Sequence, residues 1–182
     1  LKTMKFEKNT NLKSDFETSL NDDEQLDLRI WIRLLTCTHL IEKRVRKNLR
    51  DSFNTTLPRF DALVQIDRTP DGQPMRELSN RMMVTNGNIT PLVDRLVNED
   101  LIKRDPSSED RRVQHISLTQ NGKEAVDEMI PAHSSWVNNL MSNMGRDQAS
   151  DLLTLLGELK ESILAAEEIS DKTENKGENN DK

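Results

Sequence analysis

The 182-residue chain contains few of the residues on which several kinds of active site depend. It has one cysteine, three histidines and no tyrosine, and aromatic residues make up only 3% of it. The single cysteine, Cys37, cannot form an internal disulfide, and no pair of His or Cys residues has the separation of a metal-binding motif. There is also no glycine-rich phosphate loop, nucleophile elbow or H-E-x-x-H motif. The sequence therefore predicts neither an enzyme nor a metalloprotein, and no cofactor.

Long hydrophobic runs are missing as well. No segment approaches the ~20 apolar residues that span a bilayer, and no charged segment followed by an apolar one opens the chain. Met4 is a candidate natural start. A lone cysteine fits a reducing compartment. We therefore expect a cytoplasmic protein with no membrane partner.

The formal net charge of −6 disfavours a nucleic-acid partner at first sight, because phosphate attracts Lys and Arg. However, residues 1–25 hold four Lys against six acidic residues, and residues 167–182 hold three against six. That leaves 19 basic and 20 acidic residues between them. Both ends are polar with few apolar residues, so we expect disordered tails at 1–25 and 168–182. The body is nearly neutral, so the local placement of its charges decides whether it suits a nucleic-acid partner.

The body is predicted to be mainly α-helical. Residues 26–53 contain no Pro or Gly and repeat apolar residues every three or four positions, which predicts a long amphipathic helix of ~40 Å. Shorter helices are expected from Thr56 through about residue 67, at 74–83 and, after an interruption at 84–88, over the apolar positions from Ile89 to Val97. The first of these has Thr56 as its N-cap and Pro58 in its first turn. The last has Asn86 or Asn88 as its cap and Pro91 in its first turn.

After the fourth predicted helix, the spacing of apolar residues changes from a helical pattern to one typical of short strands. Residues 101–104 and 113–118 read as two strands joined by a charged loop, and two more helices follow at 120–144, with a kink at Pro131, and at 147–166. The predicted fold is therefore mainly α with a small β-hairpin wing. A winged helix-turn-helix domain at 55–118 lies between a dimerisation helix at 26–54 and C-terminal dimerisation helices at 119–167. These helices carry more apolar surface than a small domain can cover, which indicates an interface.

A helix-turn-helix followed directly by a hairpin suits double-stranded DNA. The second helix fits the major groove, while the hairpin tip reaches the backbone or the minor groove. Asn can bridge adenine and Arg can bridge guanine, whereas Arg on the preceding helix would contact phosphates. The alternative interpretation is that the polar and charged residues of this region are solvated surface residues that do not contact DNA. The candidate DNA-binding residues are Arg76, Arg81, Asn86, Asn88, Thr90, Pro91, Arg95, Asp110, Arg111 and Arg112.

The hairpin carries the most specific motif. Residues 110–122, D-R-R-V-Q-H-I-S-L-T-Q-N-G, resemble the wing signature of the MarR family of bacterial regulators, and residues 77–79 and 88–96 resemble its helix-turn-helix. The likeness covers roughly residues 26–166. It implies a homodimer that reads a pseudo-palindrome, with Asp110 steadying the wing and Arg112 entering the minor groove. It also implies a small-molecule effector that releases DNA.

Residues 30–36 and 55–61 are similar to a branch of this family that regulates the catabolism of hydroxycinnamate-like acids and responds to their CoA thioesters. The likeness predicts a repressor of a catabolic operon. Cationic residues could meet CoA phosphates, and aromatic residues could wall the acyl group. Core packing and a solvated or DNA-facing basic surface are the alternatives. The candidate effector-binding residues are Trp31, Arg44, Arg46, Lys47, Arg50, Arg59, Phe60, His133 and Trp136.

Two other functions stay open. One is a single-cysteine redox-responsive regulator, although Cys37 falls on the apolar stripe of its helix, so we expect a buried structural thiol. The other is a helical protein–protein adaptor without DNA binding, which would need no arginine-tipped hairpin.

Overall fold

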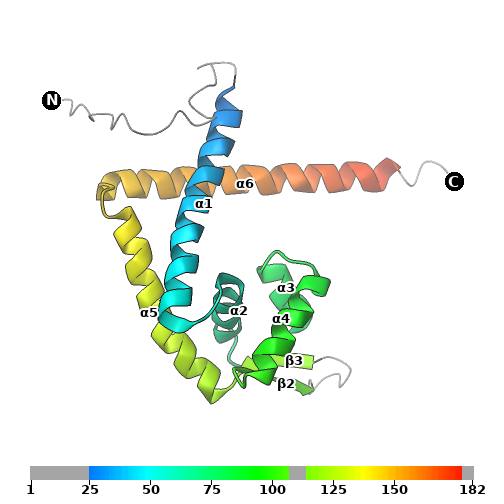
Figure 1. The fold of residues 1–182 in the computed structure, drawn as a ribbon. Coiled ribbons are helices and arrows are strands. Elements are labelled where there is room, and N and C mark those ends of the chain that lie inside the picture. The colour runs from blue at the N-terminus through cyan, green and yellow to red at the C-terminus, as the bar shows by residue number, and fades with distance from the viewer. Residues whose placement is uncertain (1–24, 107–113, 178–182) are drawn as a thin grey trace. The chain divides into compact units, whose positions relative to one another are not determined.

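The computed structural model describes residues 25–106 and 114–177, except for the side chains of Asn86 and of residues 168–177. The chain divides into two compact units, residues 1–137 and 138–182. The first contains α1–α4, three strands and most of α5 (Figure 1). The predicted fold class, mainly helical with a small β wing, is confirmed.

The long first helix is present as predicted. α1 spans Leu26–Phe53 and ends at Asn54, whose φ of 49° is in the left-handed region that Asn tolerates. Only its C-terminal half enters the core, where Val45 and Leu49 are buried. α2 spans Leu57–Asp67 with Thr56 as its N-cap and a proline in its first turn, also as predicted.

The third and fourth helices differ from the prediction at their starts. α3 spans Met75–Arg81 and begins after Pro74 instead of at it, because Pro74 belongs to β1, Gln73–Pro74. α4 spans Asn86–Asn98 and is capped by Thr85 instead of Asn86 or Asn88. Pro91 therefore lies inside the helix and not in its first turn, so Gly87 lacks the backbone donor that another residue at 91 would supply.

The sheet has three strands, one more than predicted. β2, Ile102–Pro106, and β3, Gln114–Leu118, form the expected antiparallel hairpin, in which Ile102 pairs with Leu118. β1 pairs with the other edge of β3, giving the order β1-β3-β2. A two-residue strand carries too little periodic signal to be recognised in sequence. A turn precedes it, in which Gly72 takes a φ of 84° that glycine adopts without strain.

α5 spans Gln120–Met141 and starts very close to the beginning of β2. The hydroxyl of Thr119 accepts a hydrogen bond from the Gly122 N–H at 3.0 Å and donates one to the Asp100 carbonyl at 2.6 Å. The Thr119 N–H bonds to the Leu101 carbonyl at 3.1 Å. These bonds fix the point at which the hairpin passes into the helix.

In the second unit, α6 spans Arg146–Gly177 and continues beyond the predicted end near residue 166. Its apolar side chains are mostly exposed, and Leu153 is 74% accessible.

The core of the first unit is apolar and continuous. Its fully buried large side chains are Leu49, Leu63, Ile66, Leu78, Ile89, Val93, Leu96, Ile102, Ile116 and Val126.

Candidate DNA interface

α4 separates its residues cleanly between the core and the surface. Ile89, Val93 and Leu96 are completely buried, as their helical spacing predicts. The opposite side leaves Asn88, Thr90, Pro91 and Arg95 exposed. This helix can therefore offer an amide, a hydroxyl and a guanidinium to a groove while its apolar side holds it on the core.

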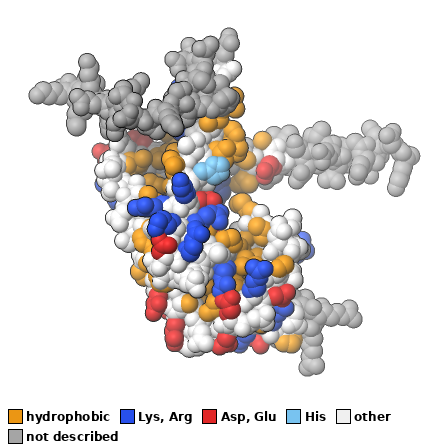
Figure 2. Space-filling view, in the orientation of Figure 1, with side chains coloured by type: hydrophobic (Ala, Val, Ile, Leu, Met, Phe, Trp, Pro, Cys, Tyr) orange, Lys and Arg blue, Asp and Glu red, His pale blue; other side chains and the backbone are white. Residues whose placement is uncertain are grey.

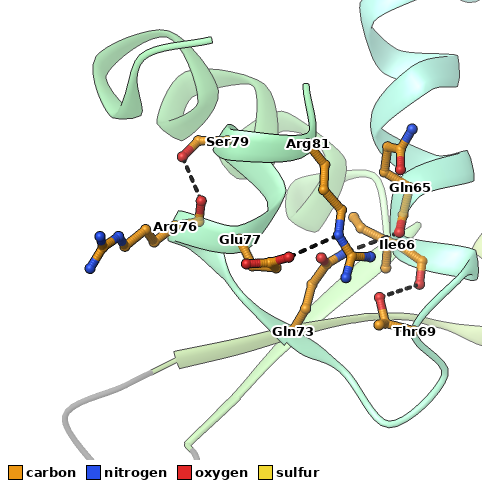
Figure 3. A network of polar contacts seen from close by, with 8 residues as sticks. All are labelled: Gln65, Ile66, Thr69, Gln73, Arg76, Glu77, Ser79 and Arg81. Atoms are coloured by element: carbon orange, nitrogen blue, oxygen red, sulfur yellow. Dashed lines mark hydrogen bonds and ion pairs between the residues drawn. The ribbon is translucent and has the colours of Figure 1, made fainter. Parts of the chain in front are cut away.

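Buried polar contacts of Gln73 and Ser79 hold the backbone at the start of α3 and along it, beneath the exposed arginines of this helix (Figure 3). Gln73 is only 2% exposed, and its side-chain amide donates to the Gln65 carbonyl at 3.0 Å, which ties β1 to α2. The Ser79 hydroxyl, also buried, donates to the Arg76 carbonyl at 2.8 Å. These contacts hold the backbone from which Arg76 and Arg81 project.

The two α3 arginines differ in their partners. The Arg76 side chain is exposed and points away from the network in Figure 3. Arg81 is also exposed, but its Nε donates to Glu77 one turn earlier at 3.1 Å. Exposed pairs of this kind contribute little to stability, so Arg81 can exchange Glu77 for a phosphate at small cost.

The tip of the predicted wing, Asp110, Arg111 and Arg112, lies outside the described residues. The base of the wing consists of the paired strands β2 and β3, and an ion pair joins it to α4. Arg104 on β2 hydrogen-bonds through Nη2 to Asp94 on α4. The strand that leads to the wing is thus attached to the helix that carries Arg95.

A second arginine–carboxylate pair holds the C-terminal end of α4. Arg59 on α2 binds Glu99 with both terminal nitrogens, and the Nη1–Oε1 distance is 2.8 Å. The hydrogen bond from Arg59 lowers the pKa of Glu99, although burial opposes the effect. Glu99 is therefore ionised at neutral pH. α4 is connected to α2 at its end and to β2 along its length.

Arg59 also lines a cleft of about 370 Å³. Its Nε is buried and has no hydrogen-bond acceptor among the described residues. The cleft combines apolar walls with two carboxylates and this guanidinium. The residues that line it are Phe53, Asn54, Thr55, Arg59, Leu63, Glu99, Leu101, Ala125, Glu128 and Met129.

Other candidate effector residues do not line this cleft. Phe60 is 4% exposed and belongs to the core, with its ring centroid 4.8 Å from that of His133. Burial lowers the pKa of His133. Trp136 lies partly buried against Phe53, at 6.0 Å between centroids, and Trp31 is 59% exposed. The structure thus places Phe60 and Trp136 in core packing, the alternative that helical spacing left open.

The basic residues of α1 form an exposed surface, visible in Figure 2 as Lys and Arg side chains gathered along this helix. Arg46 pairs with Glu42 at 2.9 Å and Lys47 pairs with Asp51. Arg44 and Arg50 have no carboxylate within ion-pair distance among the described residues. Anions can approach them without displacing an internal partner.

The expectation for Cys37 was wrong, because its side chain is exposed. It lies on the part of α1 that extends beyond the core, where Leu35 and Leu40 are exposed too. Apolar residues at helical spacing predict an apolar face, but they do not determine whether another element of the same chain covers that face. Within the described residues, no group of three or more His, Cys, Asp or Glu side chains can hold a metal ion, and no helix is long and apolar enough to cross a membrane.

Sequence reasoning missed Asp94, Glu99 and Arg104, which hold α4 in place. Each is a common charged residue in a charged sequence, and only the fold brings it to its partner. It also missed Met83, which has a left-handed backbone and a side chain 93% exposed. A Gly or Asn at that position would have signalled the end of α3.

Comparison with known proteins agrees with the geometry. Residues 55–113 match the model of the MarR family. The HTH-type transcriptional regulator YkoM of Bacillus subtilis is 25% identical over 115 residues, which cover 63% of this chain and 73% of YkoM. A MarR family transcriptional regulator from Silicibacter pomeroyi is similar in structure, with a TM-score of 0.68 and 27% identity over 79% of this chain and 99% of its own.

A further solved structure contains DNA. Streptococcus pneumoniae FabT in complex with DNA has a TM-score of 0.66 and 22% identity, covering 77% of this chain and 99% of FabT. At that identity the likeness concerns the fold. The relatives found by sequence are transcriptional regulators and not enzymes.

Proposed function

We propose that this chain is a winged helix-turn-helix transcriptional regulator of the MarR family, whose model matches residues 55–113. As a homodimer it represses a catabolic operon, and it leaves its operator when a small acid or its CoA thioester binds. The observation that carries the DNA-binding part is the two-sided α4. Its buried apolar side is seated on the core, its exposed side offers Asn88, Thr90 and Arg95, and the wing strands follow directly.

The DNA-binding proposal is tested with the DNA upstream of the chain's own gene, against unrelated DNA of equal length. We expect tight binding to the first, weakening steeply with salt because several phosphates are neutralised. Arg112→Ala should weaken binding by about 1–3 kcal/mol, the range for one arginine contact. Lys160→Ala, an exposed cation on α6, is the matched control and should change little. Equal affinity for both DNAs, or a flat salt response, would contradict the proposal.

The homodimer proposal rests on exposed apolar side chains in each unit. α1 exposes Leu28, Trp31 and Leu40, and α6 exposes Leu153 and Leu164. Apolar patches of this extent mark interfaces more often than free surface, and a second copy is the partner that a two-fold operator requires. Light scattering should give twice the protomer mass, and Leu153→Glu should reduce it. A monomer at micromolar concentration would refute the proposal.

The effector proposal combines the α1 basic surface with the Arg59 cleft. Arg44 and Arg50 suit the phosphates of CoA, while the apolar walls of the cleft and the free Nε of Arg59 suit an acyl or aromatic group with an acceptor oxygen. A ligand that competes for Arg59 would release Glu99, and with it the end of α4.

This effector is tested by adding a hydroxycinnamoyl-CoA thioester, and separately the matching free acid, to the protein–DNA complex. We expect release by the thioester alone. Arg59→Gln should weaken that response, whereas Arg68→Gln, an exposed residue after α2, should not. Release by the free acid would show that the CoA moiety is not required and would overturn the thioester assignment.

The exposure of Cys37 supports a second candidate, a redox-responsive regulator. Oxidants reach an exposed thiol more readily than a buried one. Under this alternative, peroxide would release DNA from the native protein and not from Cys37→Ser. Peroxide without effect on either protein would eliminate it.

A further inference from the structure

The turn between α3 and α4 contains a residue type that its backbone disfavours. Met83 has φ 53°, and it ends α3 with two hydrogen bonds, from its own N–H to the Asn80 carbonyl and from the Val84 N–H to the Ser79 carbonyl, both at 3.1 Å. This is the arrangement in which glycine is the usual residue, because a Cβ is strained there. α1 and α4 end with the same left-handed backbone but use Asn54 and Asp100, which tolerate it.

Packing within the chain does not explain the methionine. Its side chain is 93% exposed, the highest value among the large apolar side chains of the described residues. Val84 beside it is 37% exposed. Methionine therefore gives this turn neither a favourable backbone nor a buried side chain. A strained residue of this kind is grounds for considering a functional contact.

The position of Met83 indicates the partner. It lies between Arg81 at the end of α3 and Asn88 in the first turn of α4, two exposed residues that we assign to DNA. The C5-methyl group of thymine is the apolar group that DNA presents in its major groove. A long, flexible thioether fits an apolar contact whose outline is irregular.

We propose that Met83 is a specificity-determining DNA contact, whose side chain packs against thymine methyl groups beside the site of α4. The proposal rests on the DNA-binding function proposed above. The strain in the turn is then retained because a glycine there would relax the backbone but remove the contact.

Two variants separate the side chain from the backbone. Met83→Gly removes both the contact and the strain, and Met83→Asn removes the contact while keeping a residue that accepts the left-handed conformation. We expect both proteins to unfold at higher urea concentration than the native chain. We also expect both to bind the upstream DNA about 3- to 10-fold more weakly, as for partial loss of one apolar contact. A purely structural role would not move stability and affinity in opposite directions.

Probes in which deoxyuridine replaces thymidine identify the group contacted. The native protein should bind the uracil probe more weakly than the thymine probe, and the variants should lose less on this exchange. Equal losses in native and variant proteins would overturn the contact, because the methyl groups would then be read elsewhere. If the native protein does not bind the thymine probe at all, the proposed function itself fails and the contact fails with it.

Discussion

Gly122 is the position where the structure makes the sharpest prediction about stability. A Cβ built there lies 1.9 Å from the Leu101 carbonyl oxygen and 2.9 Å from its carbon. The obstacle is backbone, which cannot rotate away as a side chain can. In Gly122→Ala the first turn of α5 must therefore move from the start of β2 by about 1 Å or more.

The expected loss follows from the bonds at this junction. The displacement pulls the Thr119 N–H from the Leu101 carbonyl and the Thr119 hydroxyl from the Asp100 carbonyl, which lie at 3.1 and 2.6 Å. Each net hydrogen bond contributes about 1 kcal/mol, and overpacking adds about 1–3 kcal/mol. Alanine regains up to about 1 kcal/mol of helix propensity. We expect a net loss of about 2–4 kcal/mol in the free energy of unfolding.

Urea unfolding followed by far-UV circular dichroism, at fixed protein concentration, measures this loss. Gly87→Ala is the matched control in the same unit, because a Cβ there meets only the Thr85 hydroxyl at 4.0 Å. It should leave the unfolding midpoint unchanged or raise it slightly, because alanine favours the helix and meets no obstacle. A Gly122→Ala protein within about 1 kcal/mol of the native chain would show that α5 and β2 do not approach so closely.

Three further expectations concern charges. Asp94→Asn, which breaks the contact with Arg104, should reduce the preference for operator over unrelated DNA; an equal gain on both DNAs would mean that Asp94 only repels phosphate. Burial lowers the pKa of His133, so the unfolded chain takes up its proton first and the free energy of unfolding should fall as pH drops below about 6.5. His133→Gln should flatten that dependence, and an unchanged slope would assign it to other groups. Burial raises the pKa of Asp61 against the opposing Arg46, so the stability linked to its protonated form is lost as pH rises through the raised pKa. Asp61→Asn should stabilise the protein at pH 7 and not at pH 3, and the reverse order would refute this assignment.

The sequence predicted correctly those elements in which apolar residues are regularly spaced and the limits are marked by helix-breaking residues. The uninterrupted stretch that forms α1 and the apolar spacing of Ile89, Val93 and Leu96 have the structure expected of them. β1 escaped prediction because two residues cannot show a period of two. The N-cap of α4 was predicted wrongly because Thr85, Asn86 and Asn88 are all residue types that favour the N-cap position. The backbone conformation of the turn places Thr85 there.

The sequence by itself determined the order of the six helices and the β-hairpin, the amphipathic character of the helices and the polar residues offered by α4, since each depends on neighbours a few positions apart. The pairing of Arg59 with Glu99 and the burial of Phe60 were decided only by the tertiary structure. The same holds for the exposure of Cys37. These features depend on which distant segments meet, and charge and apolarity in one segment do not specify the partner that will neutralise or cover them.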